Sequence, residues 1–292
     1  SVYVVYHETE DVAGNETRRN KILRSSDGGA SWQAATELAS AVSPDDVKEP
    51  DVAADQNFVH VVWRSTVSFV GNLNVRTSAD NGSSWNAVSS IAGEFENPIV
   101  VAATGDIWHV VFARYAAANR QIHYIKAEAS PLPRLLNSFS LFSYSPAIAA
   151  AGDTLYVVWV DERDNIREIY FARNTSKGAP LSWDDGDKYA GNNNEDVTKR
   201  LSIHTEGGSS YPAIAATRQN AAHIPMVHIV WIDTRDNPGG PIGEIYYSCS
   251  SKIYAWNGLG SGYDQYPSDP DGHGTSTSSV AAACIVARSS TE

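Results

Sequence analysis

SPAIAAA, residues 145–151, is a short segment of small side chains that contains a proline and almost no large residue. LYVVWVDER (155–163) and EIYFARNT (168–175) follow it, and both are rich in Val, Ile, Tyr and Trp. β-Branched and aromatic residues favour strands over helices. The stretch therefore predicts three consecutive β-strands, of which the first has the smallest side chains.

The same order of three segments recurs along the chain, and internal repeats of this kind indicate a repeat architecture. The small-residue segments begin at residues 49 (EPDVAAD), 97 (NPIVVAA), 145 and 211 (YPAIAAT). The bulkier second segments end near Trp63, Trp159 and Trp231. Sheets that radiate from an axis crowd their innermost strands, where small residues fit, and leave wedges that large residues fill. We therefore expect an all-β, antiparallel fold, a β-propeller.

The two ends of the chain predict how the ring closes. The opening VYVVYHE (2–8) matches a second segment, and a small-residue first segment, SSVAAAC, occurs at 278–284. A C-terminal strand that completes the N-terminal blade would remove two exposed edges. We expect residues 1–292 to form one domain of five blades: 278–289 with 1–40, 49–92, 96–140, 144–202 and 211–258. A sixth blade within 250–277 is the alternative count. Exchange of the last strand between molecules would instead give self-assembly.

A second repeat reads Ser-x-Asp-x-Gly-x-x-Trp, in SSDGGASW (25–32) and SADNGSSW (78–85). Aspartate can accept hydrogen bonds from turn amides, glycine can adopt positive φ, and tryptophan can cover the hairpin. The pattern predicts a turn that fixes hairpin register, with a structural role. The residues concerned are Ser25, Asp27, Gly29, Trp32, Ser78, Asp80, Gly82 and Trp85.

This motif resembles the Asp-box, or bacterial neuraminidase repeat, of sialidase-like β-propellers. NTSKGAPLSW (174–183) resembles a degenerate copy without the aspartate. The resemblance implies the propeller fold, and in sialidases it accompanies an arginine triad, a tyrosine paired with a glutamate, and an acidic residue. The expected Arg-Ile-Pro signature is absent, and the nearest string, His223-Ile224-Pro225, lacks the arginine. We therefore expect a scaffold without sialidase activity.

Candidate catalytic residues come from two matched strings, Asp-Glu-Arg-Asp at 161–164 and Asp-Thr-Arg-Asp at 233–236. Glycosidases use two carboxyl groups about 5–10 Å apart. The candidates are Asp161, Asp164, Asp233 and Asp236 for catalysis, and Arg114, Arg163 and Arg235 for ligand binding. Tyr115, Tyr170 and Tyr246 are aromatic candidates. Because the strings sit at equivalent positions of successive repeats, the competing interpretation is that each pins its own loop.

Composition narrows the classes of partner. The formal net charge is −12, which disfavours binding to nucleic acid. No apolar segment is long enough to span a bilayer, so we expect no membrane insertion. No metal site is indicated and no cofactor is expected, although the acidic stretch 184–196 leaves calcium open. Cys249 and Cys284 either form a disulfide or remain thiols. Asn-x-Ser/Thr sequons at Asn15, Asn81 and Asn174 accept glycans only in a secretory setting.

Taken together, the sequence predicts an extracellular or cell-surface module that recognises glycans or proteins, for adhesion or assembly, without catalysis. The first alternative is a glycoside hydrolase with a diverged, sialidase-like active site. A further alternative is the propeller domain of a larger protease. DPDGHGTSTSSVAA (269–282) resembles the histidine motif of subtilisin-like proteases, in which His273 would be the general base.

Overall fold

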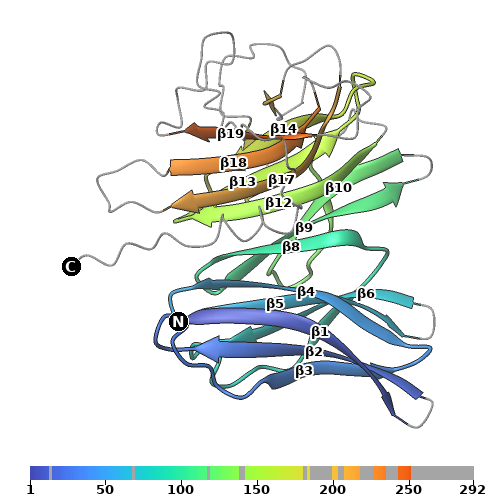
Figure 1. The fold of residues 1–292 in the computed structure, drawn as a ribbon, viewed down its shortest axis with the longest axis vertical. Helices are drawn as coiled ribbons and strands as arrows, with labels where there is room; N and C mark the ends of the chain where they lie inside the picture. Colours follow the sequence, from blue (N-terminus) through green and yellow to red (C-terminus); the bar gives the residue numbers. More distant parts are fainter. Residues whose placement is uncertain are drawn as a thin grey trace. The chain divides into compact units, whose positions relative to one another are not determined.

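The computed structural model describes residues 1–12, 15–67, 70–116, 119–137, 142–179, 183–184, 199–202, 207–217, 226–234 and 243–250. Within these ranges the regular elements are β-strands arranged in small antiparallel sheets, with no helix (Figure 1). The expected all-β, antiparallel class is confirmed. The chain divides into two compact units, residues 1–117 with 122–135 and residues 118–121 with 136–292. Each unit is described by itself.

The first unit contains three sheets whose strands follow one another along the chain. Sheet A has the order β1 (Val2–Val12), β2 (Asn15–Ser25), β3 (Thr36–Val42). Sheet B has the order β4 (Asp46–Asp55), β5 (Phe58–Val67), β6 (Val70–Ser78), β7 (Ser89–Ala92). Sheet C has the order β8 (Glu96–Thr104), β9 (Ile107–Ala116), β10 (Asn119–Lys126), β11 (Arg134–Leu135).

The second unit contains two sheets of the same kind. Sheet D has the order β12 (Ser143–Ala151), β13 (Thr154–Asp161), β14 (Glu168–Asn174), β15 (Trp183–Asp184), and β16 (Lys199–Arg200) also pairs with β14. Sheet E has the order β17 (Ser209–Thr217), β18 (Met226–Asp233), β19 (Glu244–Ser250). The blade boundaries, the blade number and the closed ring stay predictions.

The small-residue segments form the edge strands β4, β8, β12 and β17 of their sheets. Within the first unit β4 contacts β8, and within the second unit β12 contacts β17. Small side chains allow edge strands of neighbouring sheets to approach each other in this way. This agrees with the expectation that small residues mark the crowded strands. Sheet A lacks such a strand in the described part of the chain, where β1 is its edge. The segment 278–284 expected there lies outside the described residues.

Each of these edge strands carries a β-bulge at its proline. The register shifts between Lys48 and Asp51, Glu96 and Val100, Tyr144 and Ala147, and Ser210 and Ala213. Three residues that precede a proline have positive φ there: Glu49 (55°), Ser145 (50°) and Tyr211 (51°). Such φ values are uncommon for residues other than glycine, and bulges often re-aim a side chain next to a functional site. The bulges therefore make this end of the edge strands a candidate position for a functional site.

Large side chains on the second strand of a sheet fill the space between neighbouring sheets, as predicted. Trp63 is fully buried in a cluster with Ile22 and Leu38 of sheet A. Trp231 packs in a cluster that joins sheet E to Tyr156 and Phe171 of sheet D. Clusters of this size supply most of the stabilising free energy of a sheet that packs through its faces. They make the sheets of one unit a rigid support for loops at their ends.

Candidate functional site

The beginning of β12 and the end of β13 form a densely hydrogen-bonded polar region within the described part of the second unit. Ser143 lies opposite Asp161, and Tyr144 lies opposite Val160, just before the bulge at Ser145. Successive residues of a strand point to opposite faces. Asp161 is the last residue of β13 and Glu162 follows the strand, and their side chains lie in two different environments.

Asp161 is enclosed by donors and is fully buried. Its oxygen Oδ1 accepts hydrogen bonds from the backbone N–H and Nε–H of Arg163, both at 3.0 Å. Its oxygen Oδ2 accepts from Arg163 Nη2 at 2.9 Å, Ser143 Oγ at 3.0 Å, Trp159 Nε1 at 3.0 Å and Asn137 Nδ2 at 3.1 Å. A carboxylate with this many donors has little hydrogen-bonding capacity left for a substrate.

Asp233 repeats the arrangement in sheet E. It is buried, and its Oδ2 accepts hydrogen bonds from Trp231 Nε1 at 3.1 Å and from Ser209 Oγ at 2.9 Å. Ser209 lies opposite Asp233, as Ser143 lies opposite Asp161. The two aspartates therefore anchor the start of β12 and the start of β17 by the same device. Arg235 and Asp236 lie outside the described residues.

Tyr144 and Glu162 form a pair that the sequence argument did not consider. The Tyr144 hydroxyl donates a hydrogen bond to Glu162 Oε1 at 2.7 Å, and both side chains are half-buried. Burial and the bond to Glu162 raise the pKa of Tyr144, while the nearby Arg167 guanidinium acts in the opposite direction. The phenol is thus neutral at pH 7, and its proton points at a carboxylate that can receive it.

Arginines surround this pair. The guanidinium carbon of Arg120 lies 5.5 Å from the centre of the Tyr144 ring, and Arg167 is exposed. Guanidinium groups bind carboxylates through paired hydrogen bonds, and the Arg167 side chain is exposed to solvent. The environment of Tyr144 therefore favours a negatively charged ligand.

A second tyrosine–carboxylate pair involves Tyr170 on β14, and its tyrosine is buried while its carboxylate is exposed. The Tyr170 hydroxyl donates to Asp164 Oδ2 at 3.0 Å, and Arg163 lies over the Tyr170 ring at 4.0 Å. Asp164 also pairs with Arg200 Nη1 at 3.1 Å, and Arg200 Nε lies 2.9 Å from the buried Glu168. Asp164 is the exposed member of this group, with half of its side chain accessible.

The predicted arginines and aromatic residues are distributed over both units. Arg163 is engaged by Asp161 and is only 12% exposed. Arg114 is half-buried at the end of β9 in the first unit, where Tyr115 beside it is exposed. Tyr246 is buried and stacks with Trp231, at a centroid distance of 6.0 Å. Among the described residues, no group of three or more His, Cys, Asp or Glu side chains is placed to hold a metal ion.

The two Ser-x-Asp-x-Gly-x-x-Trp turns share one geometry. In the first, Ser25 Oγ donates to Asp27 Oδ1 at 2.7 Å, and Asp27 Oδ1 accepts from the Ser31 amide at 2.9 Å. The equivalent distances at Ser78, Asp80 and Ser84 are 2.7 and 2.8 Å. Gly29 and Gly82 have φ of 101° and 82°. These bonds lower the pKa of both aspartates, that of Asp80 to about 2.

In the degenerate turn at 174–183, Asn174 takes the part that Ser25 has in the first turn. Its Oδ1 accepts hydrogen bonds from the amides of Ser176 at 2.9 Å and Gly178 at 2.8 Å, and its Nδ2 donates to the Ala179 carbonyl at 2.9 Å. Asn174 is fully buried. The sequon at this position is therefore closed to glycosylation in the folded protein.

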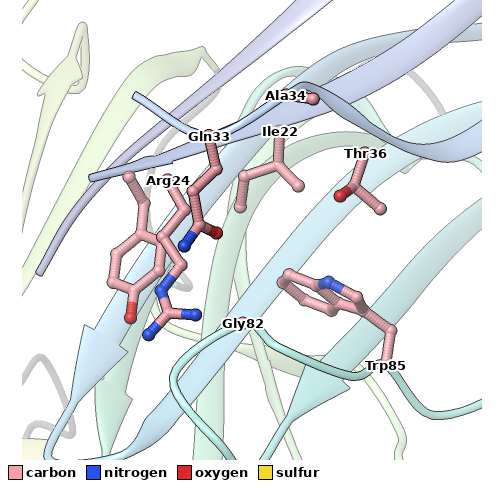
Figure 2. Close-up of a pocket in the computed structure, with 8 residues that line it drawn as sticks. Ile22, Arg24, Gln33, Ala34, Thr36, Gly82 and Trp85 are labelled. Atoms are coloured by element: carbon pink, nitrogen blue, oxygen red, sulfur yellow. The ribbon is translucent and has the colours of Figure 1, made fainter. Parts of the chain in front are cut away.

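A small pocket in the first unit lies between sheet A and the second turn, and Figure 2 shows its lining. Tyr3 Oη donates to the Asn81 carbonyl at 3.0 Å, and Arg24 Nη1 donates to Ser83 Oγ at 2.8 Å. A Cβ on Gly82 would lie 3.2 Å from the Tyr3 ring. The cavity measures ≈ 20 Å³, which is room for about one water molecule. It seats the turn against sheet A and is too small for a sugar ring.

Asp51 on β4 is a further carboxyl group that sequence reasoning missed. Its oxygens accept hydrogen bonds from the amides of Val52 at 2.9 Å and Val101 at 2.8 Å, so it ties β4 to β8 within the first unit. Burial raises its pKa to about 6. Asp51 replaces the apolar or small residue found at this position in the other edge strands, and that difference is visible in the sequence.

No family model and no curated protein matches the chain. Solved structures do. One is a GH93 α-L-arabinofuranosidase of Fusarium graminearum in complex with arabinobiose, with 11% identity, TM-score 0.48, and coverage of 71% of this chain and 63% of that one. Another is a polysaccharide lyase of family PL25, an ulvan lyase (8%, 0.47, 82% and 63%). A third is Trypanosoma rangeli sialidase in complex with sialic acid (12%, 0.45, 83% and 45%).

These comparisons contradict the expectation that the protein is a non-catalytic recognition module. The similar structures are named as enzymes that act on glycans, which agrees with the alternative interpretation as a glycoside hydrolase. The sequence argument inferred a lack of catalysis from the missing Arg-Ile-Pro string and did not consider Tyr144 and Glu162. This chain spans less than two thirds of the length of each of the three. At 8–12% identity the likeness concerns the fold, so any activity rests on this chain's own residues.

Proposed function

We propose that the chain is a glycoside hydrolase that acts on an acidic sugar, with Tyr144 as nucleophile and Glu162 as its base. The observation that carries the proposal is the 2.7 Å hydrogen bond from the Tyr144 hydroxyl to Glu162 Oε1 in a half-buried, arginine-flanked position. Sialidases are the class of glycosidase in which a tyrosine takes the place of the carboxylate nucleophile.

The substrate class follows from charge. A carboxylate nucleophile would repel a sugar that carries its own carboxylate, whereas a neutral phenol does not. Arg120 and Arg167 lie near Tyr144 and supply the opposite charge. A sugar carboxylate held by these guanidinium groups would orient the ring so that its anomeric carbon approaches the phenol oxygen.

The proposed reaction has two displacements. In the first, Tyr144 Oη bonds to the anomeric carbon, Glu162 takes the phenol proton, and the bond to the leaving oxygen breaks as an acid protonates that oxygen. In the second, water attacks the anomeric carbon, the conjugate base of that acid takes the water's proton, and Tyr144 leaves and regains its proton from Glu162. Asp161 and Asp233 are enclosed, so Asp164 and Asp236 remain the candidates for the acid.

The test uses a panel of 4-methylumbelliferyl glycosides that includes a sialoside, a glucuronide and an arabinofuranoside. We expect turnover of an acidic glycoside and its loss in Glu162→Gln, which keeps the shape of the side chain. Tyr124→Phe is the matched control, because Tyr124 is a buried tyrosine that bonds His109 at 2.8 Å in the first unit. A 2-fluoro glycoside should label the peptide that contains Tyr144. Wild-type turnover in Glu162→Gln, or turnover of none of the substrates, would contradict the proposal.

We also propose that the sheets form the blades of one ring, which residues 278–284 close by pairing with β1. Two observations support this proposal. β4, β8, β12 and β17 each pair with the second strand of their sheet, and these second strands resemble β1 in sequence. β1 itself has no such neighbour in the described part of the chain. Deletion of residues 275–292 should then lower the melting temperature. An unchanged melting temperature and an unchanged mass in light scattering would show that the tail contributes neither to closure nor to self-assembly.

A further inference from the structure

Tyr211 is an exposed aromatic residue on a strand of small side chains. It is 64% exposed, whereas Tyr156, Tyr170 and Tyr246 in the same unit are buried. It has no hydrogen bond, ion pair or ring contact with another residue in the described part of the chain. Leaving a large aromatic surface in water forgoes the free energy that its burial would contribute. Its position is therefore not explained by packing.

The backbone holds Tyr211 in this position at a cost. It precedes Pro212, has φ of 51°, and occupies the bulge between Ser210 and Ala213. A bulky side chain at positive φ is a genuine outlier among residues other than glycine, and such outliers gather at functional sites. After the bulge, Ile214 and Ala216 pack against the core, whereas Tyr211 within the bulge is exposed.

The register places Tyr211 at the level in sheet E that the proposed site has in sheet D. The strands β12 and β17 contact each other within the second unit. Ser143 opposite Asp161 and Ser209 opposite Asp233 mark the same level in both sheets, and each bulge follows two residues later. Tyr211 is therefore the counterpart of Ser145, the residue next to Tyr144.

We infer that Tyr211 is a stacking platform for a sugar ring of the substrate, a specificity-determining position that rests on the proposed function. Aromatic rings present an apolar face that matches the C–H face of a pyranose, and this contact requires no charge. Arg120 and Arg167 lie near Tyr144, where the acidic sugar would bind. The ring of Tyr211 would therefore contact a neutral sugar that is linked to the acidic sugar. The inference predicts a preference for oligosaccharides over the isolated acidic sugar.

The experiment measures kcat and KM of Tyr211→Ala, Tyr211→Phe and the wild type on 3′-sialyllactose and on a glucuronoxylan oligosaccharide, in which an acidic sugar is linked to neutral xylose. Loss of an aromatic stacking contact should raise KM about tenfold in Tyr211→Ala and leave kcat within about twofold. Tyr211→Phe should match the wild type, because the ring and not the hydroxyl makes the contact. Leu132→Ala, at a residue 67% exposed in the first unit, controls for the loss of exposed apolar surface.

The outcomes separate this inference from the proposed function. Hydrolysis by the wild type with an unchanged KM in Tyr211→Ala overturns the stacking role and leaves the hydrolase standing. Without hydrolysis by the wild type, binding of the same two oligosaccharides is measured by titration calorimetry. Equal affinity of wild type and Tyr211→Ala, or no binding by either, overturns the stacking role, whereas a tenfold weaker Tyr211→Ala supports it.

Discussion

Two tyrosine–carboxylate pairs in sheet D have the same chemistry and different surroundings. Tyr144 donates to Glu162 at 2.7 Å, and Tyr170 donates to Asp164 at 3.0 Å. Burial raises the pKa of both tyrosines. Tyr144 is half-buried, however, while Tyr170 is 5% exposed and lies under the guanidinium of Arg163. We expect access to the hydroxyl, and not the hydrogen bond itself, to distinguish a reactive tyrosine from a structural one.

Removing each hydroxyl in turn tests this comparison most directly. Tyr144→Phe should lower kcat by at least about 10³-fold, because the nucleophile is lost. Tyr170→Phe should lower it by no more than about tenfold, because that hydroxyl cannot reach a substrate. The measurement is turnover of the acidic glycoside identified from the panel, with near-ultraviolet circular dichroism to confirm folding. Equal losses in the two variants would remove the distinction between the pairs.

Substitutions at the two neighbouring aspartates, Asp161 and Asp164, should differ in their effect on the free energy of unfolding. Asp161→Ala removes a buried carboxylate and leaves the Arg163 guanidinium without its partner, which should lower the free energy of unfolding by about 3–5 kcal/mol. Asp164→Ala removes an ion pair with Arg200 that is partly exposed, which should cost about 1 kcal/mol or less. Urea denaturation measures both. A small effect of Asp161→Ala would mean that the cluster at the start of β12 is not an anchor.

The smallest effect concerns the pH dependence of two carboxyl groups in the first unit. Hydrogen bonds lower the pKa of Asp80 from an ordinary value of 3.8 to about 2. Its contribution to stability is thus present above pH 3.8 and is lost as the pH falls towards 2. Burial raises the pKa of Asp51 to about 6. Its contribution is present below pH 3.8 and is lost as the pH rises through 6.

Thermal unfolding of Asp80→Asn and Asp51→Asn between pH 3 and 8 checks this opposition of sign. The difference between Asp80→Asn and the wild type should shrink towards acid pH. Asp51→Asn should compare least favourably with the wild type at acid pH, improve as the pH rises from 3.8 towards about 6, and stay level above that. Parallel curves for wild type and both variants would contradict the assigned surroundings of these carboxyl groups.

The sequence was sufficient for the strands and their order, because small residues and Trp63 or Trp231 occupy fixed places in each repeat. It was not sufficient for the bulges. Glu49, Ser145 and Tyr211 differ in type, and only the proline after each is shared. Positive φ at these positions is set by the pairing of the whole strand, which no local propensity encodes.

The site was harder to predict because one residue of sequence decides which side of a strand a group faces. Asp161 was chosen as a candidate because Asp233 repeats it in the sequence. In the structure both aspartates accept hydrogen bonds from a tryptophan and anchor a strand, so the repeated residue is structural. Glu162 lies one residue on and has no acidic counterpart in the string at 233–236. A search for the carboxyl group that breaks the repeat, next to an aromatic residue before the proline, would have found the pair.

The bulge in the edge strands has a consequence for how such a protein can change. At each bulge the main chain is fixed by the strand pairing on either side, while Glu49 and Tyr211 project outward as exposed side chains. Replacement there alters what the surface offers to a ligand without removing a core contact. Directed evolution of a new specificity should therefore start with a codon library at residues 49, 145 and 211. The strand pairing on either side holds the backbone at these positions, so a change of side chain should leave the fold intact.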